Sequence, residues 1–266
     1  MNNSYLSIAI PTYNSSEYLL RLLKSISKFN LVNEVVIQDD FSSKEEIEAI
    51  EKIVASFPTD KFEIKVYRND KNIGAFLNKI KAVCNCKNEF VYQIDSDNLP
   101  GRNLDLIFQS IKKEKDKDLI YYPSKLIQTI EDSILKKLKY LLFQQNNVLL
   151  SKDDKLVSLL SIQNAIKNNE KITINKNYRW ILNCGNFIVN KEMFKNIFEI
   201  NNFEINDYFI LDAVAFNYFW LKNKGQIKLL KNHYHFHKKR ANSVSILNAE
   251  KTIESFDYFE RKILSL

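Results

Sequence analysis

The first hundred residues alternate short apolar runs with longer stretches that are apolar along one side only. Four apolar runs have the length of strands, and they lie at residues 5–10, 34–40, 61–69 and 89–95. Three stretches between them repeat apolar residues at helical spacing, and they lie at residues 15–29, 43–57 and 74–85. Strands that alternate with helices in this way predict an α/β fold, a Rossmann-like, doubly wound and mostly parallel sheet with helices on both faces.

Two of the predicted helices begin with polar residues suited to capping. Ser15 or Ser16 precedes the apolar stripe of the first helix. Ser43 and Glu46 have the spacing of a capping box at the start of the second, in which each side chain bonds the backbone N–H of the other residue.

Polar clusters follow three of the predicted strands. They are the residues 11–14 after the first strand, Asp39 and Asp40 at the end of the second, and Asp95 and Asp97 after the fourth. Ligands of doubly wound sheets bind beyond the carboxyl ends of the strands. We therefore expect the three clusters at one ligand-binding edge.

The alternation weakens beyond residue 127. Residues 132–170 predict a basic helix with an apolar stripe, which either packs over the core or touches an anionic membrane surface. Three later elements are predicted: a strand that enters a helix at 179–194, an apolar helix at 207–225 and a last strand at 226–237. We expect a single domain, residues 1–266, with a first half of 1–125 and a second half of 126–266.

Composition narrows the class of protein only a little. A hydrophobic fraction of 45% with 27% charged residues is typical of a soluble globular chain. The amino terminus has no basic region and Pro11 interrupts its apolar run, so we expect a cytoplasmic protein. The net charge of +7 could attract phosphates, nucleic acid or anionic lipid and does not distinguish among these binding partners. No basic-aromatic motif suggests a nucleic-acid partner. Cys84, Cys86 and Cys184 have no zinc-type pairing and predict buried, reduced thiols.

Asp95 and Asp97 are the clearest chemical signal. Two carboxylates two residues apart stay ionised together when a divalent cation or ordered donors offset their repulsion. Mg²⁺ and Mn²⁺ favour oxygen ligands supplemented by substrate phosphates. A pair of solvated turn aspartates is the alternative, and the position at a ligand-binding edge favours the metal.

Four segments resemble a known family. They are "SIAIPTYNSSEYLLRLLKSI", "EVVIQDDFSS", "NIGAFLNK" and "YQIDSDN", in this order along the chain. Together they resemble the donor-binding half of family 2 glycosyltransferases of the GT-A fold, of the type that builds bacterial surface glycans. The resemblance covers the first hundred residues well and residues 183–237 more loosely.

The resemblance implies a site for a nucleotide-diphosphate sugar, expected to be a UDP-sugar. The implied donor-binding residues are Pro11, Thr12, Tyr13, Asp40, Asn72, Gly74, Lys79, Asp95 and Ser96. Among them, Asp40 would accept a hydrogen bond from the base, while Asp39 would be structural. Lys79 would approach the diphosphate, where the family more often has arginine, and Asp95 would lie near the ribose and the metal.

The resemblance also implies a metal cofactor, Mn²⁺ or Mg²⁺. Asp97 would bind it where it bridges the two phosphates. A histidine, either His235 or His237, would complete the metal or phosphate site ahead of the Ser243 and Ser245 pair.

The second half must supply a base for the acceptor hydroxyl. Asp212 fits the family's Glu-Asp position ahead of a helix that ends in glycine, although Leu211 stands where glutamate is usual. Asp207 or Glu204 is the alternative base.

These residues predict a metal-dependent inverting glycosyltransferase. It would move a sugar to a hydroxyl of a glycan or lipid-linked acceptor in surface polysaccharide biosynthesis, and touch the inner face of the cytoplasmic membrane if the basic stretch binds lipid. A sugar nucleotidyltransferase and a non-catalytic nucleotide-sugar-binding scaffold are the alternatives. The first would show a glycine-rich phosphate loop after the first strand, and "PTYNSSEYL" has no glycine.

Overall fold

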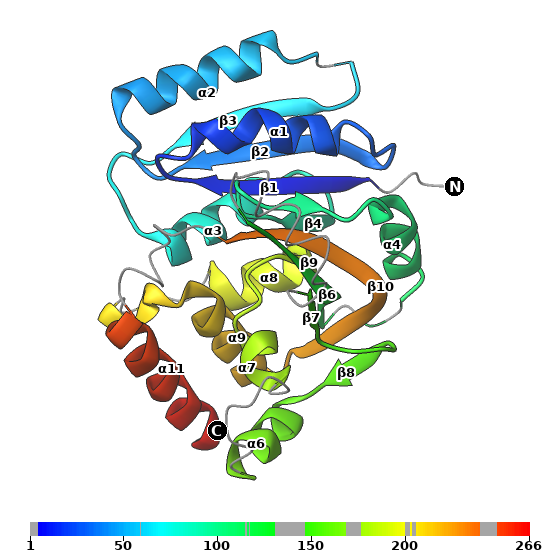
Figure 1. Ribbon diagram of the computed structural model, residues 1–266, viewed down its shortest axis with the longest axis vertical. Coiled ribbons are helices and arrows are strands. Elements are labelled where there is room, and N and C mark those ends of the chain that lie inside the picture. Colours follow the sequence, from blue (N-terminus) through cyan, green and yellow to red (C-terminus); the bar gives the residue numbers. More distant parts are fainter. Residues whose placement is uncertain are drawn as a thin grey trace. The chain divides into compact units, whose positions relative to one another are not determined.

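The computed structural model describes residues 5–58, 60–114, 116, 118–130, 147–168, 177–199, 203, 206–239 and 249–266. The chain divides into two compact units (Figure 1). Unit 1 comprises Met1–Ile120 and Gly185–Phe203, and unit 2 comprises Tyr121–Cys184 and Glu204–Leu266. The expectation of one domain with two halves stays a prediction, and the segment 185–203, placed in the second half, belongs to unit 1.

Unit 1 contains the strands and helices predicted for the first hundred residues. Its strands are β1 (Leu6–Thr12), β2 (Val32–Asp39), β3 (Glu63–Arg68), β4 (Phe90–Gln93), β5 (Leu99–Pro100) and β9 (Phe187–Asn190). Its helices are α1 (Ser16–Ile26), α2 (Lys44–Ser56), α3 (Ala75–Cys84), α4 (Leu104–Ile111) and α8 (Lys191–Phe198). The four strands and three helices predicted there are confirmed, each within a few residues of its predicted ends.

The unit 1 strands form a mostly parallel sheet in the order β3-β2-β1-β4-β9. The first four run parallel, and β9 pairs antiparallel with β4. Thr12 pairs with Asp39, and Asp39 with Arg68, so β1, β2 and β3 end at the same level. All seven residues of β1 are buried, as expected for a strand covered on both faces.

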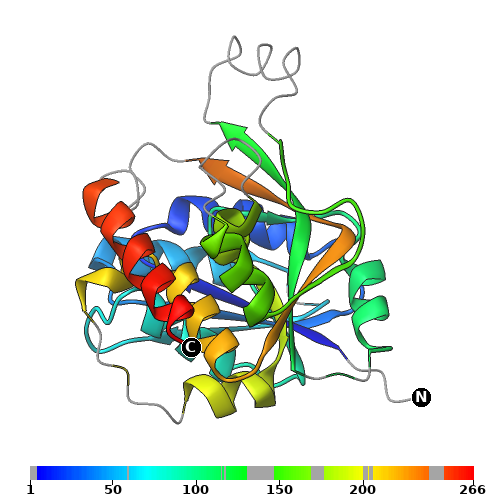
Figure 2. The same cartoon turned by 90° about the horizontal axis from the view of Figure 1, so that it is seen from below.

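Helices cover both faces of this sheet, as predicted. Figure 2 shows α1 and α2 on one face of the strands and α3 and α8 on the other. The apolar stripe of α1 is fully buried, with Leu22, Leu23 and Ile26 at 0% exposure. On the opposite face α3 packs against β1, β2 and β4 and against α8. The buried layers hold the strand ends in fixed positions.

The helix caps differ from the prediction in two respects. Ser15 occupies the cap position of α1, but its side chain makes no capping bond. Ser43 caps α2 and accepts the N–H of Glu46 at 3.4 Å, which confirms half of the predicted capping box. The other half is wrong, because the Glu46 carboxylate accepts the N–H of Ser16 at 2.9 Å instead. Glu46 therefore supplies the acceptor that the first turn of α1 lacks.

Unit 2 mixes short strands with helices. Its elements are β6 (Leu119–Ile130, beginning at the unit boundary), β7 (Asn147–Leu149), β8 (Lys155–Val157), α6 (Leu159–Lys167), α7 (Asn177–Leu182), η1 (Asp207–Ile210), α9 (Asp212–Lys222), β10 (Gln226–Lys239) and α11 (Ala249–Leu264). The strand β7 pairs antiparallel with β6, and β8 with β10. The last predicted strand is confirmed as β10.

Three predictions for the second half need correction. The helix predicted at 207–225 begins only at Asp212, because residues 207–210 form a 3₁₀ turn. The segment 179–194 was predicted to be a strand followed by a helix. Its first residues belong instead to the helix α7, and the strand β9 and the helix α8 follow. Of the helix predicted at 132–170, residues 159–167 are helical as α6, whereas residues 147–149 and 155–157 are the strands β7 and β8; the predicted apolar stripe lies outside the described residues.

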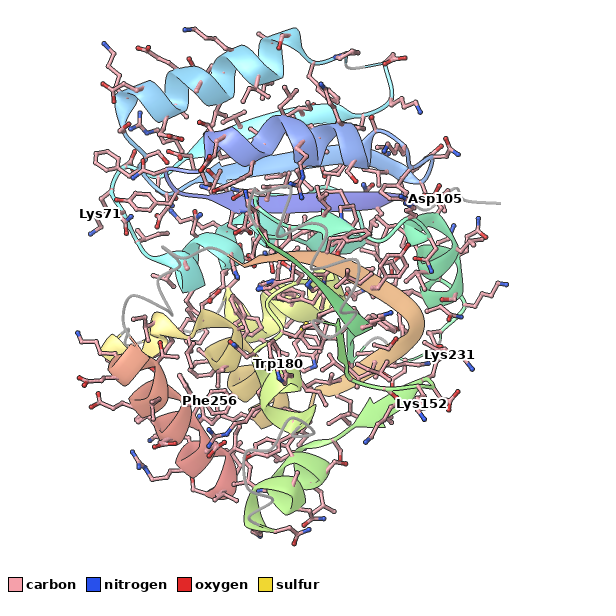
Figure 3. The ribbon with its side chains drawn as sticks, in the orientation of Figure 1. Lys71, Asp105, Lys152, Trp180, Lys231 and Phe256 are labelled. Carbon is pink, nitrogen blue, oxygen red and sulfur yellow. The ribbon has the colours of Figure 1, made fainter. Side chains whose placement is uncertain are left out.

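An ion pair joins α7 to α11 within unit 2. Arg179 donates from Nε to Glu260 at 3.0 Å and from Nη2 at 3.2 Å, a two-point contact. Its guanidinium carbon lies 4.8 Å from the ring centroid of Phe256, which Figure 3 labels on α11. Among the described residues, no helix is long and apolar enough to cross a membrane.

Candidate functional site

The polar strand ends of unit 1 meet at one edge, as predicted. Asp40 donates its backbone N–H to the carbonyl of Thr12 at 2.9 Å, which ties the end of β2 to that of β1. The hydroxyls of Ser15 and Ser96 share a hydrogen bond at 2.9 Å, which ties the loop after β1 to that after β4. In Figure 3, Lys71 marks this carboxyl edge of the sheet and Asp105 the opposite end.

The carboxylate of Asp40 is buried and accepts three hydrogen bonds. Oδ1 accepts from Asn69 Nδ2 and from the backbone N–H of Ile73, and Oδ2 from the backbone N–H of Gly74, each at 2.9 Å. A carboxylate offers about four acceptor positions, so about one remains for a further donor. The backbone donors come from the loop before α3, and Asp40 therefore anchors that loop to the end of β2.

Asp39 closes the turn that follows β2. Its Oδ2 accepts the N–H of Ser42 at 3.0 Å, and its Oδ1 accepts the hydroxyl of the same serine. The guanidinium of Arg68 lies 3.5 Å from Oδ2. Asp39 is fully buried, and these contacts fit the structural role suggested from the sequence.

The loop before α3 depends on a glycine. Gly74 has φ +85°, in the left-handed region, and an added Cβ would meet no atom within 4 Å, so backbone conformation rather than space selects glycine. Its N–H also reaches Asn72 Oδ1 at 3.2 Å. Asn72 and Gly74 thus shape the approach to the amino end of α3.

Lys79 and Asp95 form an ion pair at the same edge. Their Nζ and Oδ1 atoms are 2.8 Å apart, with side-chain exposures of 8% and 31%. Gln93 Nε2 donates to the same Oδ1 at 3.2 Å, and Asn186 Oδ1 accepts the backbone N–H of Asp95 at 2.8 Å. Asp95 thus holds the buried ammonium group in place, and Asn186 fixes the backbone at Asp95.

Three amide side chains that support the edge were missed from the sequence. Asn69 orients Asp40 and also donates to Asn78 Oδ1 at 2.9 Å, and Asn78 donates to the carbonyl of Gln38 at 3.0 Å. Asn186 supports Asp95 from the start of β9. For Asn69 and Asn186 the only signal in the sequence was a position beside a strand end, in a loop, where asparagine is common.

Asp97 is the predicted metal ligand of unit 1. Its side chain is buried, and it follows Asp95 in the loop between β4 and β5. Within the described part of the chain no group of three or more His, Cys, Asp or Glu residues is placed to hold a metal ion. Mg²⁺ is commonly held by one or two carboxylates together with substrate phosphates, and the oxygens of Asp95 and Asp97 are donors of that kind.

Unit 2 places Asp212 at the first position of α9. Asn217, on the same helix, donates to the carbonyls of Leu182 and Ala213 at 2.8 and 2.9 Å and accepts the hydroxyl of Tyr122 at 3.1 Å. These bonds fix α9 against α7. Two alternative catalytic bases were predicted. For Asp207 the structure describes the backbone but not the side chain, and Glu204 lies outside the described residues.

The three histidines lie at alternate positions of β10. Burial lowers the pKa of His233 to about 4. Burial, with smaller contributions from the neighbouring histidines, lowers the pKa of His235 well below its ordinary value. Both imidazoles are therefore neutral at pH 7, the form that binds metals. His235 and His237 belong to unit 2 and Asp97 to unit 1, so their joint role stays a prediction; Ser243 and Ser245 lie outside the described residues.

The three cysteines are free thiols, as predicted; Cys86 and Cys184 are buried, as predicted, whereas Cys84 is only half-buried. Burial raises the pKa of Cys84 to about 12 and raises that of Cys86 as well. Thiols with raised pKa values are poor nucleophiles and poor metal ligands at neutral pH. Cys84 and Cys86 are therefore not candidates for chemistry.

A parallel sheet whose carboxyl edge gathers acidic, amide and lysine side chains has the ligand-binding edge of a doubly wound α/β protein. The profile of glycosyl transferase family 2 matches residues 7–198, and the chain belongs to that family. The fold is GT-A: solved structures of Staphylococcus aureus TarS (residues 1–349) with UDP and with UDP-GlcNAc superpose with TM-scores of 0.58 and 0.60. Each is 19% identical, and the alignments cover 97% and 98% of this chain and 64% and 66% of TarS 1–349.

Curated relatives match less than half of the chain. The poly(ribitol-phosphate) beta-N-acetylglucosaminyltransferase TarS of S. aureus is 33% identical over 95 residues, 34% of this chain and 16% of TarS. The glycosyltransferase GlyG of Streptococcus pneumoniae is 26% identical over 117 residues, 43% of this chain and 37% of GlyG. Chondroitin synthase of Escherichia coli is 29% identical over 117 residues, 43% of this chain and 16% of that enzyme. The matches thus cover well under half of each relative.

Proposed function

We propose that the protein is a metal-dependent inverting glycosyltransferase. It transfers a sugar from a nucleotide-diphosphate donor, a UDP-sugar, to a hydroxyl of a glycan or lipid-linked acceptor in surface polysaccharide biosynthesis. The observation that carries the proposal is the carboxyl edge of unit 1, where Asp40, Lys79 and Asp95 hold defined positions. Membership of family 2 and the UDP-GlcNAc complex of a structural neighbour support the donor class.

Asp40 supplies recognition of the base. Three donors within unit 1 occupy most of its acceptor capacity, and about one position remains. Uracil presents a single imide N–H, which matches a single free acceptor. Because the carboxylate is buried and fixed, that hydrogen bond forms without reordering the site.

Lys79 and Asp95 prepare the site for the diphosphate. The ion pair fixes the ammonium group, which acts as a point charge toward phosphate oxygens. Asp97 would hold Mn²⁺ or Mg²⁺, with Asp95 near it, and the ion would supply charge stabilisation for the departing diphosphate. A neighbouring solved structure, GalNAc-T7 with UDP, GalNAc and Mn²⁺, contains such an ion; it is 14% identical with a TM-score of 0.57 over 91% of this chain and 45% of that chain.

Asp212 acts as the base in this scheme. It takes the proton of the acceptor hydroxyl while the oxygen bonds to the anomeric carbon from the face opposite the diphosphate. The bond from that carbon to the diphosphate breaks, and the nucleoside diphosphate leaves with the electron pair. The product therefore has inverted anomeric configuration.

The cellular location is proposed to be the cytoplasm. Contact with the inner face of the membrane was inferred from the basic stretch 132–170, of which residues 132–146 and 169–170 lie outside the described residues. It stays a prediction with no structural support.

A donor screen tests the proposed function. The wild-type chain is incubated with UDP-, GDP- and CDP-sugars and with Mn²⁺ or Mg²⁺, and release of nucleoside diphosphate is measured. We expect donor-dependent release with a UDP-sugar, reduced roughly 100-fold or more in Asp97→Ala and in Asp212→Ala. The exposed Asp60, in the loop before β3, gives the matched control Asp60→Ala, which should behave as wild type.

Each proposed role has an outcome that would reject it. Donor-dependent release of nucleoside diphosphate that survives Asp97→Ala would reject Asp97 as the metal ligand. Loss of donor binding in Asp212→Ala would reject a role for Asp212 confined to taking the proton of the acceptor hydroxyl. Release of pyrophosphate from a nucleoside triphosphate and a sugar phosphate, without diphosphate release, would point to a nucleotidyltransferase.

A further inference from the structure

Phe41 has an unfavourable backbone conformation at the carboxyl edge. Its φ is +65°, in the left-handed region that bulky side chains rarely adopt. The other non-glycine residues with positive φ in the described part of the chain are Asn14, Lys224 and Asn232, all polar. Phe41 is also 48% exposed, so burial of its ring in the core does not offset the strain.

The ring of Phe41 is backed by a fixed cation. The guanidinium carbon of Arg68 lies 5.1 Å from the ring centroid, within the range of a cation–π contact. Arg68 is itself held, because Nη2 donates to the carbonyl of Ser42 at 2.8 Å and Nε lies 3.5 Å from Asp39. A half-exposed ring with the guanidinium against it is a rigid aromatic surface.

The position of this surface relates it to the nucleotide. Phe41 directly follows Asp40, whose carboxylate has one acceptor position left for a base. The loop that carries Phe41 is tied to the loop after β1: Asn14 donates its N–H to Ser42 Oγ at 2.9 Å, and Ser43 donates to Asn14 Oδ1 at 3.0 Å. Tyr13, in that second loop, is 52% exposed. Two exposed aromatic side chains thus occupy adjacent strand ends beside the base-reading acid.

Folding alone does not explain a phenylalanine here. Glycine or asparagine would adopt the same conformation with less strain, and a single exposed ring adds little core packing. Strained residues that the surrounding structure holds in place concentrate at ligand-binding sites. Every nucleobase offers an aromatic face for stacking.

We propose that Phe41, supported by Arg68, stacks against the base of the donor nucleotide and sets the affinity for it. The inference rests on the proposed function, because it requires a nucleotide donor. It assigns to Phe41 a contribution to affinity that Asp40 cannot supply, since a hydrogen bond reads one edge of the base and stacking contacts its face.

Calorimetric titration with two probes tests this role. UDP contains the base, and inorganic pyrophosphate contains only the phosphates; both are titrated into the full chain with Mn²⁺. We expect Phe41→Gly to weaken UDP binding roughly 5- to 150-fold, the range that corresponds to the ~1–3 kcal/mol of one base–aromatic stack, and to leave pyrophosphate binding unchanged. Phe41→Trp should bind UDP at least as well as wild type. Leu106→Ala, which shortens a side chain 67% exposed on α4, is the matched control and should change neither titration.

Thermal unfolding separates this role from a structural one. Glycine relieves the left-handed strain, so we expect the melting temperature of Phe41→Gly to equal or exceed that of wild type while UDP binding falls. Wild-type UDP affinity in Phe41→Gly would overturn the inference and leave the proposed function intact. A parallel loss of UDP binding, pyrophosphate binding and stability would also overturn it, since Phe41 would then merely order the loop. A wild-type chain that binds no nucleoside diphosphate would overturn the proposed function and this inference with it.

Discussion

Replacing Asp40 tests how the base-reading edge is built. Its carboxylate accepts one hydrogen bond from the buried Asn69 side chain and two from the backbone of Ile73 and Gly74. Asp40→Ala removes all three acceptor contacts. Asp40→Asn keeps an acceptor oxygen for the donors at Oδ1 but places an NH₂ group against the N–H of Gly74.

The two variants should lose different amounts of stability. A hydrogen bond to a charged group contributes ~1.5–3 kcal/mol, and a buried donor left unpaired costs ~1–3 kcal/mol. Gly74 and Ile73 lie closer to solvent, so water can replace their lost acceptor, and we expect about 3 kcal/mol for Asp40→Ala and about 1.5 kcal/mol for Asp40→Asn. For a chain of this size these values correspond to melting temperatures lower by roughly 6–12 °C and 3–6 °C.

Nucleotide titration provides the second readout. The NH₂ group in Asp40→Asn presents a donor where the carboxylate presents an acceptor, so it matches the acceptor N3 of cytosine better than the N–H of uracil. We expect the preference for UDP over CDP to fall by roughly tenfold or more, the effect of about one hydrogen bond to a charged group. Unchanged melting of Asp40→Ala would refute the stability reasoning, and an unchanged UDP preference in Asp40→Asn would refute base reading.

Three further predictions concern residues outside the proposed donor-binding set. Ser43→Ala removes the side-chain cap of α2 and should lower stability by ~1 kcal/mol in chemical unfolding, whereas Ser43→Asp should preserve it. Gly225→Ala would place a Cβ 2.4 Å from Nε1 of the fully buried Trp220, so we expect a loss of ~1–3 kcal/mol and a shifted tryptophan emission; normal emission and stability would show that the site has room. Burial raises the pKa of Cys84 to about 12, so at pH 8 this thiol should react with an aromatic disulfide reagent far more slowly in the native chain than in the unfolded chain, and equal rates would contradict its burial.

Much of the fold of unit 1 could be predicted because the alternation of apolar strands with helices determines it. Buried parallel strands read as continuous apolar runs, and their carboxyl ends lie together whatever the side chains are. The residues placed at those ends from the sequence, such as Asp40 and Lys79, therefore do meet at one edge. What they contact there was not predictable: two of the three donors to Asp40 are backbone groups more than thirty residues away, and Glu46 bonds Ser16 rather than its own capping residue.

The second half was harder for a physical reason. Residues 147–149 and 155–157 are strands because they pair with β6 and β10, partners distant in sequence, and tertiary pairing overrides local helical periodicity there. The helix predicted from residue 207 starts later because Asp207–Ile210 close a 3₁₀ turn before Asp212. Helical spacing of apolar residues does not distinguish a short 3₁₀ turn from the first turn of an α-helix.

The most direct test of the central claim is donor turnover by the wild-type chain and by Asp97→Asn, a nearly isosteric change that removes one negative charge. Release of UDP from UDP-sugars is followed with Mn²⁺, with Mg²⁺ and with excess chelator. The account predicts UDP release by wild type that the chelator abolishes, and release at least about 100-fold slower in Asp97→Asn at unchanged melting temperature. Turnover that is equal in both proteins and indifferent to chelator would contradict it.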